Sequence, residues 1–388
     1  MKQRNVLVQI GLFDQRQLLG ISRFAKDHQW HLTVDDRFDL PYGWDGDGAI
    51  VLLHGRDELL PFIRHLKVPV VDLGYYYPKM RIPRVIGDHE MIGKLAADHF
   101  SERYYTDIAW FSTLWTNVHR LRFKGLCDNW RGNSPTRWVW SENSPKDKYN
   151  EWATMTRWLK SNLENSPKPL AIFCFDDYDA SRIQDACIAS GIKVPNEVAI
   201  MGVGNVELLG ENRTVPLASI RHDLEGIGYH GAELLHKLMN GAHAPRNPIL
   251  IPPKGIVLRQ SADYIAVQSP VVRSALIYIQ ANISRSFGAS EIATHLKVSR
   301  TTLDRKIKAD MGHSLGAEIL TQRVVQAKLL LQNTSLKVQQ IAKQTGFCDT
   351  SHLTRSFAKF TGTTPLKYRI RHQAEPSKVI CVRPRRKA

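Results

Sequence analysis

The sequence predicts a chain of two parts: a two-lobed α/β region over residues 1–268, followed by an all-α region with two helix-turn-helix units over residues 269–373. Three observations predict this division. Short apolar runs alternate with amphipathic stretches in the front region, a detailed repeat follows it, and nearly all the excess positive charge lies in the last third. With 388 residues and 43% hydrophobic content, the chain is long enough for two or three soluble globular domains.

The front region carries apolar or β-branched runs that have the length of strands. They are residues 5–12, 48–54, 68–74, 106–113, 137–142, 170–177 and 197–205. Stretches with the spacing of amphipathic helices lie between and after them, at residues 89–103, 149–163 and 223–241. This alternation predicts parallel sheets buried on both faces, and its length predicts two lobes. Because ligands of open α/β sheets bind at the carboxyl ends of strands, residues just after each strand are candidate ligand contacts.

The N-terminal segment and the cysteines favour a protein that stays in the cytoplasm. The first apolar run is short, is broken by Gln9 and lacks a small-residue cleavage site, so we expect a buried strand rather than a signal peptide. No stretch approaches the ~18 uninterrupted apolar residues of a membrane span. The cysteines have neither CxxC nor zinc-site spacing, so we expect reduced thiols, no metal and no cofactor. They are Cys127, Cys174, Cys187, Cys348 and Cys381.

A segment rich in Pro and turn residues, 241–270, closes the α/β region, and we place the domain boundary near Gln268 to Pro270. Residues 269–388 hold 21 Lys/Arg against 6 Asp/Glu, whereas residues 1–268 hold 32 against 31. A positive charge concentrated in one domain is expected when that domain binds nucleic-acid phosphates or an anionic membrane. The last residues, 374–388, form a basic tail that we expect to be disordered.

The all-α region contains one pattern twice, in Ile292–Gly312 and in Ile341–Gly362. Each copy has Ile-Ala, then Leu-x-Arg-x-(Ile/Phe), then four residues and a Gly. Ser299 in the first copy, and Asp349 or Thr350 in the second, are suitable N-caps for a second helix. The pairs Leu303 with Ile307 and Leu353 with Phe357 are four residues apart and are expected to face inward.

A short helix, a tight turn and a second capped helix are the signature of a helix-turn-helix, whose second helix enters the major groove of DNA. Arg is the commonest partner of guanine, and Thr and Ser contact bases or phosphates. The expected DNA contacts are Arg300, Thr301, Thr302, Asp304 and Arg305 in the first unit, and Thr350, Ser351, His352, Thr354 and Arg355 in the second. Residues 316–334, predicted as one long helix, would hold the two units in successive major grooves about 34 Å apart.

Two other interpretations of the basic region are a helical bundle with a solvated basic face and a membrane-surface module. A bundle does not explain matching inward residues and matching Arg placement in two copies. Membrane binding predicts a continuous basic amphipathic helix rather than two capped turns. We therefore favour DNA binding.

A family resemblance becomes specific in the repeated region. The stretch from Ser290 to Arg369, including "GFCDTSHLTRSFAKFTGTTPLKYR", resembles the DNA-binding domain of the AraC/XylS family of bacterial transcription activators. The first copy departs from the family pattern at Lys297, where a turn Gly is common. The resemblance implies double-stranded DNA as a partner, a homodimer and contact with RNA polymerase.

The front region resembles the LacI/GalR regulator core, which is itself similar to periplasmic sugar-binding proteins of the type I two-lobed fold. The resemblance covers residues 83–130 and 170–264, in pieces such as "VIGDHEMIGKLAADHF", "RLRFKG" and "AIFCFDDYDA". A core of this kind ahead of an AraC-type domain is the arrangement of the xylose operon regulators, which this chain resembles nearly end to end. The resemblance carries an effector-binding role onto Arg122, Asp176, Asp177 and Asn205, and more weakly onto Asp88 and Gln15.

One departure bears on the effector. Where the family has Gly-Val-Asp-Asn-Asp, this chain has Gly-Val-Gly-Asn-Val at Gly202 to Val206, so two carboxylates beside the ligand are missing. Each would have given a sugar hydroxyl a charge-assisted hydrogen bond of about 1.5–3 kcal/mol. The alternatives are xylose, another sugar, a sugar acid that those carboxylates would repel, or no effector.

The sequence thus favours a cytoplasmic transcription regulator that responds to a small sugar-like effector and has no membrane partner. A regulator that binds DNA constitutively, with a degenerate sensor, is the main alternative and is supported by the missing carboxylates. An enzyme that uses Asp176 and Asp177 as paired carboxylates is disfavoured, because neighbours in an extended strand point to opposite faces. The sequence also has no GxSxG, HExxH, P-loop or nucleotide-binding motif.

Overall fold

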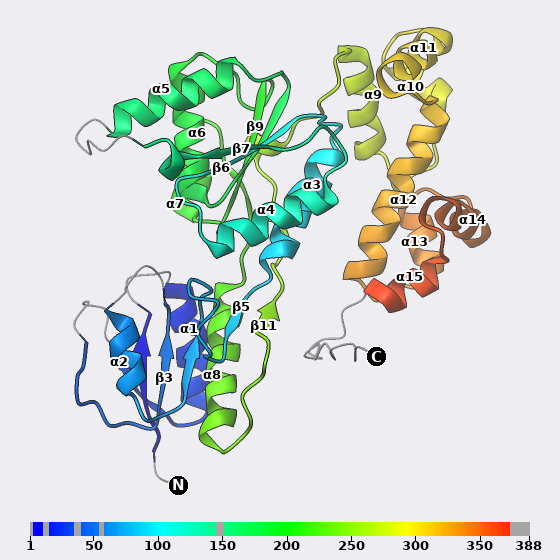
Figure 1. Ribbon diagram of the computed structural model, residues 1–388. Helices are drawn as coiled ribbons and strands as arrows, with labels where there is room; N and C mark the ends of the chain where they lie inside the picture. The colour runs from blue at the N-terminus through cyan, green and yellow to red at the C-terminus, as the bar shows by residue number, and fades with distance from the viewer. Residues whose placement is uncertain (1–2, 11–14, 35–39, 54–57, 145–150, 373–388) are drawn as a thin grey trace, which may run out of the picture. The chain divides into compact units, whose positions relative to one another are not determined.

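The computed structural model describes residues 3–10, 15–34, 40–53, 58–144 and 151–372 (Figure 1). The chain divides into two compact units, Met1–Tyr264 and Ile265–Ala388. The first unit is α/β and the second is helical, so the predicted fold class is confirmed. The basic tail expected over 374–388 lies outside the described residues.

The first lobe is built on a parallel sheet of four strands in the order β2-β1-β3-β4. Successive residues of β1 face opposite sides, since Val6 and Val8 belong to one apolar cluster and Leu7 belongs to another. Helix α8 returns late in the chain to pack on α1. The elements are β1 (Asn5–Gln9), α1 (Gln15–Asp27), β2 (His31–Val34), β3 (Gly48–Val51), α2 (Leu59–His65), β4 (Val70–Asp72) and α8 (Leu224–Met239).

The second lobe has a sheet of six strands in the order β12-β10-β9-β8-β6-β7, parallel except for β12. Strands β6, β8 and β9 are buried along their whole length, as the apolar runs predicted. The strands are β6 (Ile108–Ser112), β7 (Thr136–Val139), β8 (Leu170–Cys174), β9 (Val198–Val203), β10 (Ala218–Ile220) and β12 (Ile256–Val257). The helices are α3 (His89–Ser101), α4 (Asn117–Asn129), α5 (Glu151–Glu164), α6 (Asp177–Ala189) and α7 (Glu207–Glu211).

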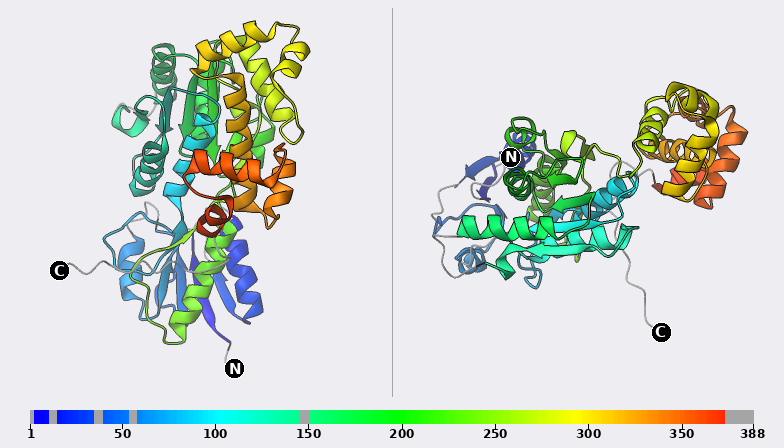
Figure 2. Two further views of the ribbon diagram at one scale, coloured as in Figure 1. Left: turned by 90° about the vertical axis from the view of Figure 1, so that its right-hand side faces the viewer. Right: turned by 90° about the horizontal axis from the view of Figure 1, so that it is seen from above.

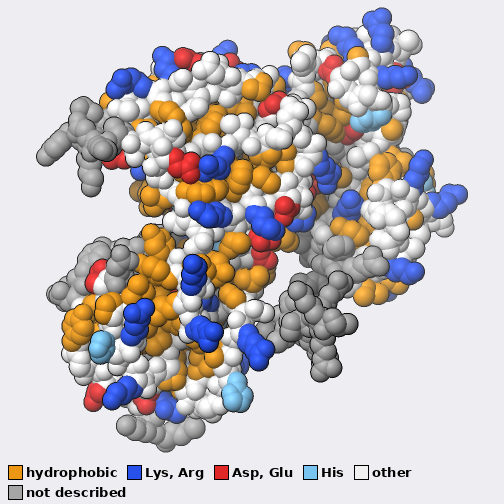
Figure 3. All heavy atoms as spheres, in the orientation of Figure 1, with side chains coloured by type: hydrophobic (Ala, Val, Ile, Leu, Met, Phe, Trp, Pro, Cys, Tyr) orange, Lys and Arg blue, Asp and Glu red, His pale blue; other side chains and the backbone are white. Residues whose placement is uncertain are grey.

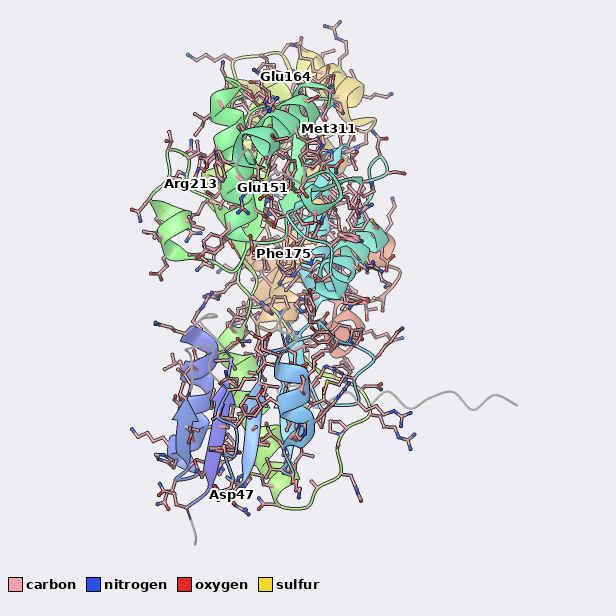
Figure 4. The ribbon with its side chains drawn as sticks, turned by 60° about the vertical axis from the view of Figure 1, so that its left-hand side comes forward. Asp47, Glu151, Glu164, Phe175, Arg213 and Met311 are labelled. Carbon is pink, nitrogen blue, oxygen red and sulfur yellow. The ribbon has the colours of Figure 1, made fainter. Side chains whose placement is uncertain are left out.

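The chain passes between the lobes before α3, before α8 and after β11. Two of these passages run side by side, because β5 (Val85–Gly87) pairs with β11 (Ile249–Ile251) in parallel. The carboxyl ends of β6, β8 and β9 and the first turns of α3, α4 and α6 lie at one edge of the second lobe. Phe175, which follows β8, lies at this edge, on the side that faces the first lobe (Figure 4). We call this region the interlobe edge.

The second unit consists of helices arranged around the long helix α12 (Leu315–Asn333), which runs between two helix-turn-helix units (Figure 2). The first helix-turn-helix unit is α10 (Ala289–His295) with α11 (Arg300–Met311), and the second helix-turn-helix unit is α13 (Val338–Gln344) with α14 (Thr350–Thr361). Helix α9 (Pro270–Ala281) precedes them and α15 (Pro365–His372) follows.

Local sequence explains where the recognition helices begin and end. Ser299 accepts a hydrogen bond from the Thr302 N–H at 3.1 Å, and Asp349 accepts one from the His352 N–H at 2.7 Å. Gly312 and Gly362, each in the left-handed conformation, end these two helices. No helix among the described residues is long and apolar enough to cross a membrane.

Candidate effector site and nucleic-acid interface

Arg122 lies buried at the interlobe edge, on α4, with only 4% of its surface exposed. Its Nε donates to His89 Nδ1 at 3.3 Å, and its Nη1 donates to the Phe175 carbonyl oxygen. The guanidinium carbon stands 4.4 Å from the centre of the Phe175 ring. Burial lowers the pKa of Arg122 to about 10, against the opposing charges of Asp176 and Asp177. The arginine remains protonated at neutral pH.

Three histidines surround this arginine, and sequence analysis missed them. The His119 ring stacks on Phe175 with ring centres 3.7 Å apart, and the His89 and His222 rings are 5.5 Å apart. Burial, followed by the charge of Arg122, lowers the pKa of His89 well below its usual value, so His89 is neutral. The positions of two of them could have revealed them in the sequence, because His89 is the first residue of α3 and His222 lies shortly after the end of β10.

Asp177 is placed at the interlobe edge, but both of its carboxylate oxygens have partners within the protein. One oxygen accepts from the Ser219 hydroxyl at 2.6 Å and the other accepts from the Val206 N–H at 2.7 Å. The side chain is 1% exposed. Its carboxylate therefore fastens the loop after β9 to β10, and we assign it a positioning role.

Asp176 caps α6 by accepting the Asp179 N–H at 2.7 Å, and its side chain is half-buried. Asp179, one turn further along, accepts the Thr113 N–H at 3.1 Å and pairs with Arg182 at 2.9 Å. Burial, together with the charge of Asp176, raises the pKa of Asp179 to about 7. Asp176 also has a hydrogen bond from the Tyr178 N–H, but it is half-buried whereas Asp177 and Asp179 are buried, so it is the one of these three carboxylates that a ligand can reach.

The loop after β9 has an unusual backbone, with Gly204 at φ +126° and Asn205 at φ +54°. An Asp at position 204 would be strained in this conformation, which Gly adopts readily. The Asn205 N–H donates to the Ser219 hydroxyl at 2.9 Å. Its side-chain Oδ1 is buried and has no hydrogen-bond partner among the described residues. Such an atom is a candidate acceptor for a ligand.

The first lobe reaches this loop through Arg16, whose Nη1 donates to the Gly204 carbonyl at 2.7 Å. Gln15 stands one residue earlier, exposed at the start of α1. Asp88 caps α3 by accepting the Met91 N–H at 2.9 Å, next to His89. The predicted residues thus come from separate segments of both lobes.

A cavity of about 480 Å³ also lies in the second lobe, between the ends of β6 and β7 and helices α5 and α6. None of the predicted ligand residues lines it. The lining residues are Thr113, Leu114, Trp140, Ser141, Ser144, Glu151, Trp152, Met155 and Arg182.

In the first helix-turn-helix unit, Arg300, Thr301 and Arg305 are exposed along the outer face of α11. Arg300 stands 3.7 Å from Asp304, which is a loose surface pair. The half-buried Thr302 accepts a hydrogen bond from the Ser299 hydroxyl at 2.8 Å. The inward residues Leu303 and Ile307 are fully buried, as predicted.

In the second unit, Ser351 and Arg355 are exposed on α14, while Thr350, His352 and Thr354 are half-buried. The Thr354 hydroxyl donates to the Thr350 carbonyl at 2.8 Å. Within the described part of the chain, neither Arg305 nor its counterpart Arg355 has a hydrogen bond or ion pair. Basic side chains project from the surfaces of both units (Figure 3).

Comparison with known proteins agrees with the division of the chain into an α/β region and a helix-turn-helix region. Residues 97–262 match the family described as periplasmic binding protein-like domain, and residues 292–371 match a helix-turn-helix domain. The xylose operon regulatory protein of Haemophilus influenzae is 26% identical and covers 92% of this chain and 95% of its own length. The corresponding protein of Escherichia coli K12 is 24% identical over 92% and 94%.

A solved structure of a xylose-binding transcription activator has the same fold, with a TM-score of 0.59 over 96% of this chain and 100% of that one, at 22% identity. The two domains together define the class: the chain is a DNA-binding transcription regulator with a periplasmic-binding-protein-like sensor core, and not an enzyme. Within that class it is similar along nearly its whole length to the xylose operon regulatory proteins.

Proposed function

We propose that this regulator binds a small, sugar-like effector at the interlobe edge and that binding changes how its helical unit engages operator DNA. The observation that carries the proposal is the unpartnered, buried Oδ1 of Asn205 in the loop that Asp177 fastens, on the lobe that also buries Arg122. Sugars present both donors and acceptors, and their hydroxyls match such a mixed set of groups.

The proposed roles follow from the remaining hydrogen-bonding capacity of each side chain. Arg122 retains Nη2 for a ligand acceptor, Asn205 offers Oδ1 to a hydroxyl donor, and Asp176 offers its half-buried carboxylate. Asp177 positions the loop. Asp88 and Gln15 complete the proposed contacts from the start of α3 and from the first lobe.

Operator recognition is assigned to the two recognition helices. Arg305 and Arg355 occupy equivalent positions and are exposed, so we propose that they contact bases. The remaining expected contacts, Arg300, Thr301, Thr302, Asp304, Thr350, Ser351, His352 and Thr354, are proposed to contact phosphates or neighbouring base edges. We further propose that the protein acts in the cytoplasm as a homodimer and contacts RNA polymerase.

An effector can alter DNA binding only if it favours one arrangement of the sensor over another. Arg16 links the lobes at Gly204, and Asn117 of α4 donates to the Tyr76 carbonyl at 3.1 Å. These two bonds hold the lobes together without a ligand. They favour a second candidate function, a regulator that binds DNA constitutively and whose sensor is always closed.

Calorimetry and DNA binding together separate the two candidates. Thermal unfolding of the full-length protein is measured by scanning calorimetry with pentoses, hexoses, polyols and sugar acids, and binding to its operator is measured with and without each compound. A compound at 100 times its Kd should stabilise the protein by about 2.7 kcal/mol. Loss of this stabilisation in Asn205→Ala, with operator binding retained, supports the proposal. Operator binding that no compound alters, in a protein that binds none of them, supports constitutive binding.

A further inference from the structure

The buried arginine at the interlobe edge lacks a counterion. Arg122 is 4% exposed, and the atoms its guanidinium contacts are a histidine nitrogen, a carbonyl oxygen and an aromatic ring. It makes no ion pair with any described carboxylate. A buried charge without a partner is costly, because none of its contacts neutralises it.

The carboxylates near Arg122 form their hydrogen bonds and ion pairs with other residues. Asp177 uses both oxygens on Ser219 and Val206, and Asp179 is paired with Arg182. Asp176 acts on Arg122 from beyond ion-pair distance while it caps α6. The charge of Arg122 is therefore only partly balanced by the protein itself.

Apart from Asp88, which caps α3, the remaining neighbours are neutral or basic. The loop after β9 presents Gly204, Asn205 and Val206, none of which is acidic, and Arg16 brings a second guanidinium to the Gly204 carbonyl. The neutral His89 accepts from Arg122 through Nδ1, so its proton is on Nε2, where it can be donated. Helices α3, α4 and α6 also begin at this edge, and helix N-termini favour negative charge.

We infer that the effector is anionic: a sugar acid whose carboxylate pairs with Arg122 while its hydroxyls bond to Asn205 and Asp176. This inference rests on the proposed function and names the chemical class of its effector. A carboxylate fits because the Arg122 Nη2 and the second proton of Nη1 form a planar fork, which matches two oxygens of one group. A phosphate would bring additional negative charge close to Asp176.

The test compares each acid with its neutral parent by isothermal titration of the full-length protein. The pairs are xylonate with xylose, gluconate and glucuronate with glucose, and galacturonate with galactose, with sugar phosphates and inorganic phosphate in parallel. At least one acid is expected to bind about tenfold or more tighter than its parent sugar, with an affinity that falls as salt rises.

Two variants at one position isolate the effect of charge. Val206→Asp adds a carboxylate beside the site, and Val206→Asn adds a neutral group of the same shape. Position 206 is the N-cap of α7 with an extended backbone, where Asp and Asn are both well tolerated. The Asp variant should bind the acid about tenfold more weakly than the Asn variant, because like charges repel. Arg122→Gln should abolish acid binding, with circular dichroism and operator binding as checks on folding.

The outcomes separate this inference from the function on which it rests. Tight binding of a neutral sugar with no preference for its acid would overturn the anionic effector and leave the sensor proposal intact. Binding of a sugar phosphate alone would overturn the carboxylate. If no compound bound a folded protein that still bound operator DNA, both effector proposals would fail. Equal acid affinities in the two Val206 variants would remove the electrostatic argument.

Discussion

The two helix-turn-helix units share a sequence pattern but differ in how their turns are packed. Each turn contains a residue in the left-handed conformation, Lys297 at φ +55° in the first unit and Gly346 at φ +69° in the second. Lys297 is exposed. Gly346 is buried, and a Cβ there would lie 2.6 Å from the Ile283 carbonyl oxygen and 2.7 Å from that of Arg285.

One backbone requirement thus has two different solutions in the same domain. A position in the left-handed conformation with space around it tolerates a lysine at a modest cost in strain. The second turn lies against the chain that joins α9 to α10, so it admits no side chain at all.

Gly346→Ala should destabilise the second unit by about 3 kcal/mol, because the new methyl group meets two backbone carbonyls in a conformation already unfavourable for Ala. The measurement is hydrogen exchange by mass spectrometry on the full-length chain, comparing peptides from α13 and α14. Lys297→Ala is the matched control and should leave protection of α10 and α11 within experimental error. Unchanged protection in Gly346→Ala would remove the proposed difference between the turns.

Arg305→Ala and Arg355→Ala should each weaken operator binding by about 1–3 kcal/mol, or roughly 5- to 150-fold, if both arginines contact bases. Fluorescence anisotropy with operator and scrambled DNA measures the change. Lys26→Ala removes the same charge from the exposed end of α1 and is expected to have little effect. An equal loss on both DNAs would show phosphate contact instead, and a loss at one arginine alone would show that one unit dominates specificity.

Removing the N-caps should cost about 1 kcal/mol at each recognition helix. Asp349→Ala should cost more than Ser299→Ala, because the Asp carboxylate makes the shorter capping bond and also interacts with the helix dipole. Urea unfolding of each variant, with Asp349→Asn to separate charge from hydrogen bonding, checks the order. A larger cost at Ser299 would contradict it.

Lys297→Gly should have the smallest effect, a gain of about 0.5 kcal/mol, since glycine relieves the left-handed strain but adds freedom to the unfolded chain. Differential hydrogen exchange in α10 and α11 would detect it. A loss of stability would mean that the lysine side chain makes a contribution that exceeds its strain.

Periodic features of the sequence predicted most of the fold. Alternating apolar runs predicted the two lobes, and the repeat predicted both helix-turn-helix units down to the buried pairs Leu303 with Ile307 and Leu353 with Phe357. These features are local, so spacing along the chain is enough to detect them. The cap at Asp349 was also predictable, because its partner is only three residues away.

The candidate effector site was predictable only in part, because its chemistry depends on contacts between distant segments. Nothing in "FDDYDA" predicts that Asp177 bonds to Ser219 and Val206, and nothing near Arg16 predicts its bond to Gly204. The neutral state of His89 beside Arg122 depends on burial that only the fold creates. Sequence similarity predicted which residues form the candidate site, whereas the tertiary structure determines which of its polar groups remain available.

The length of α12 sets the rotational phase between the two recognition helices. The helix has 19 residues and contacts both units. One inserted residue would rotate the second unit by about 100° and move it about 1.5 Å, which turns its recognition helix away from the groove. Four inserted residues would nearly restore the phase and advance the unit by about 6 Å, close to two base-pair steps. The spacing of operator half-sites can therefore change only in discrete steps that follow the helical repeat of this spacer.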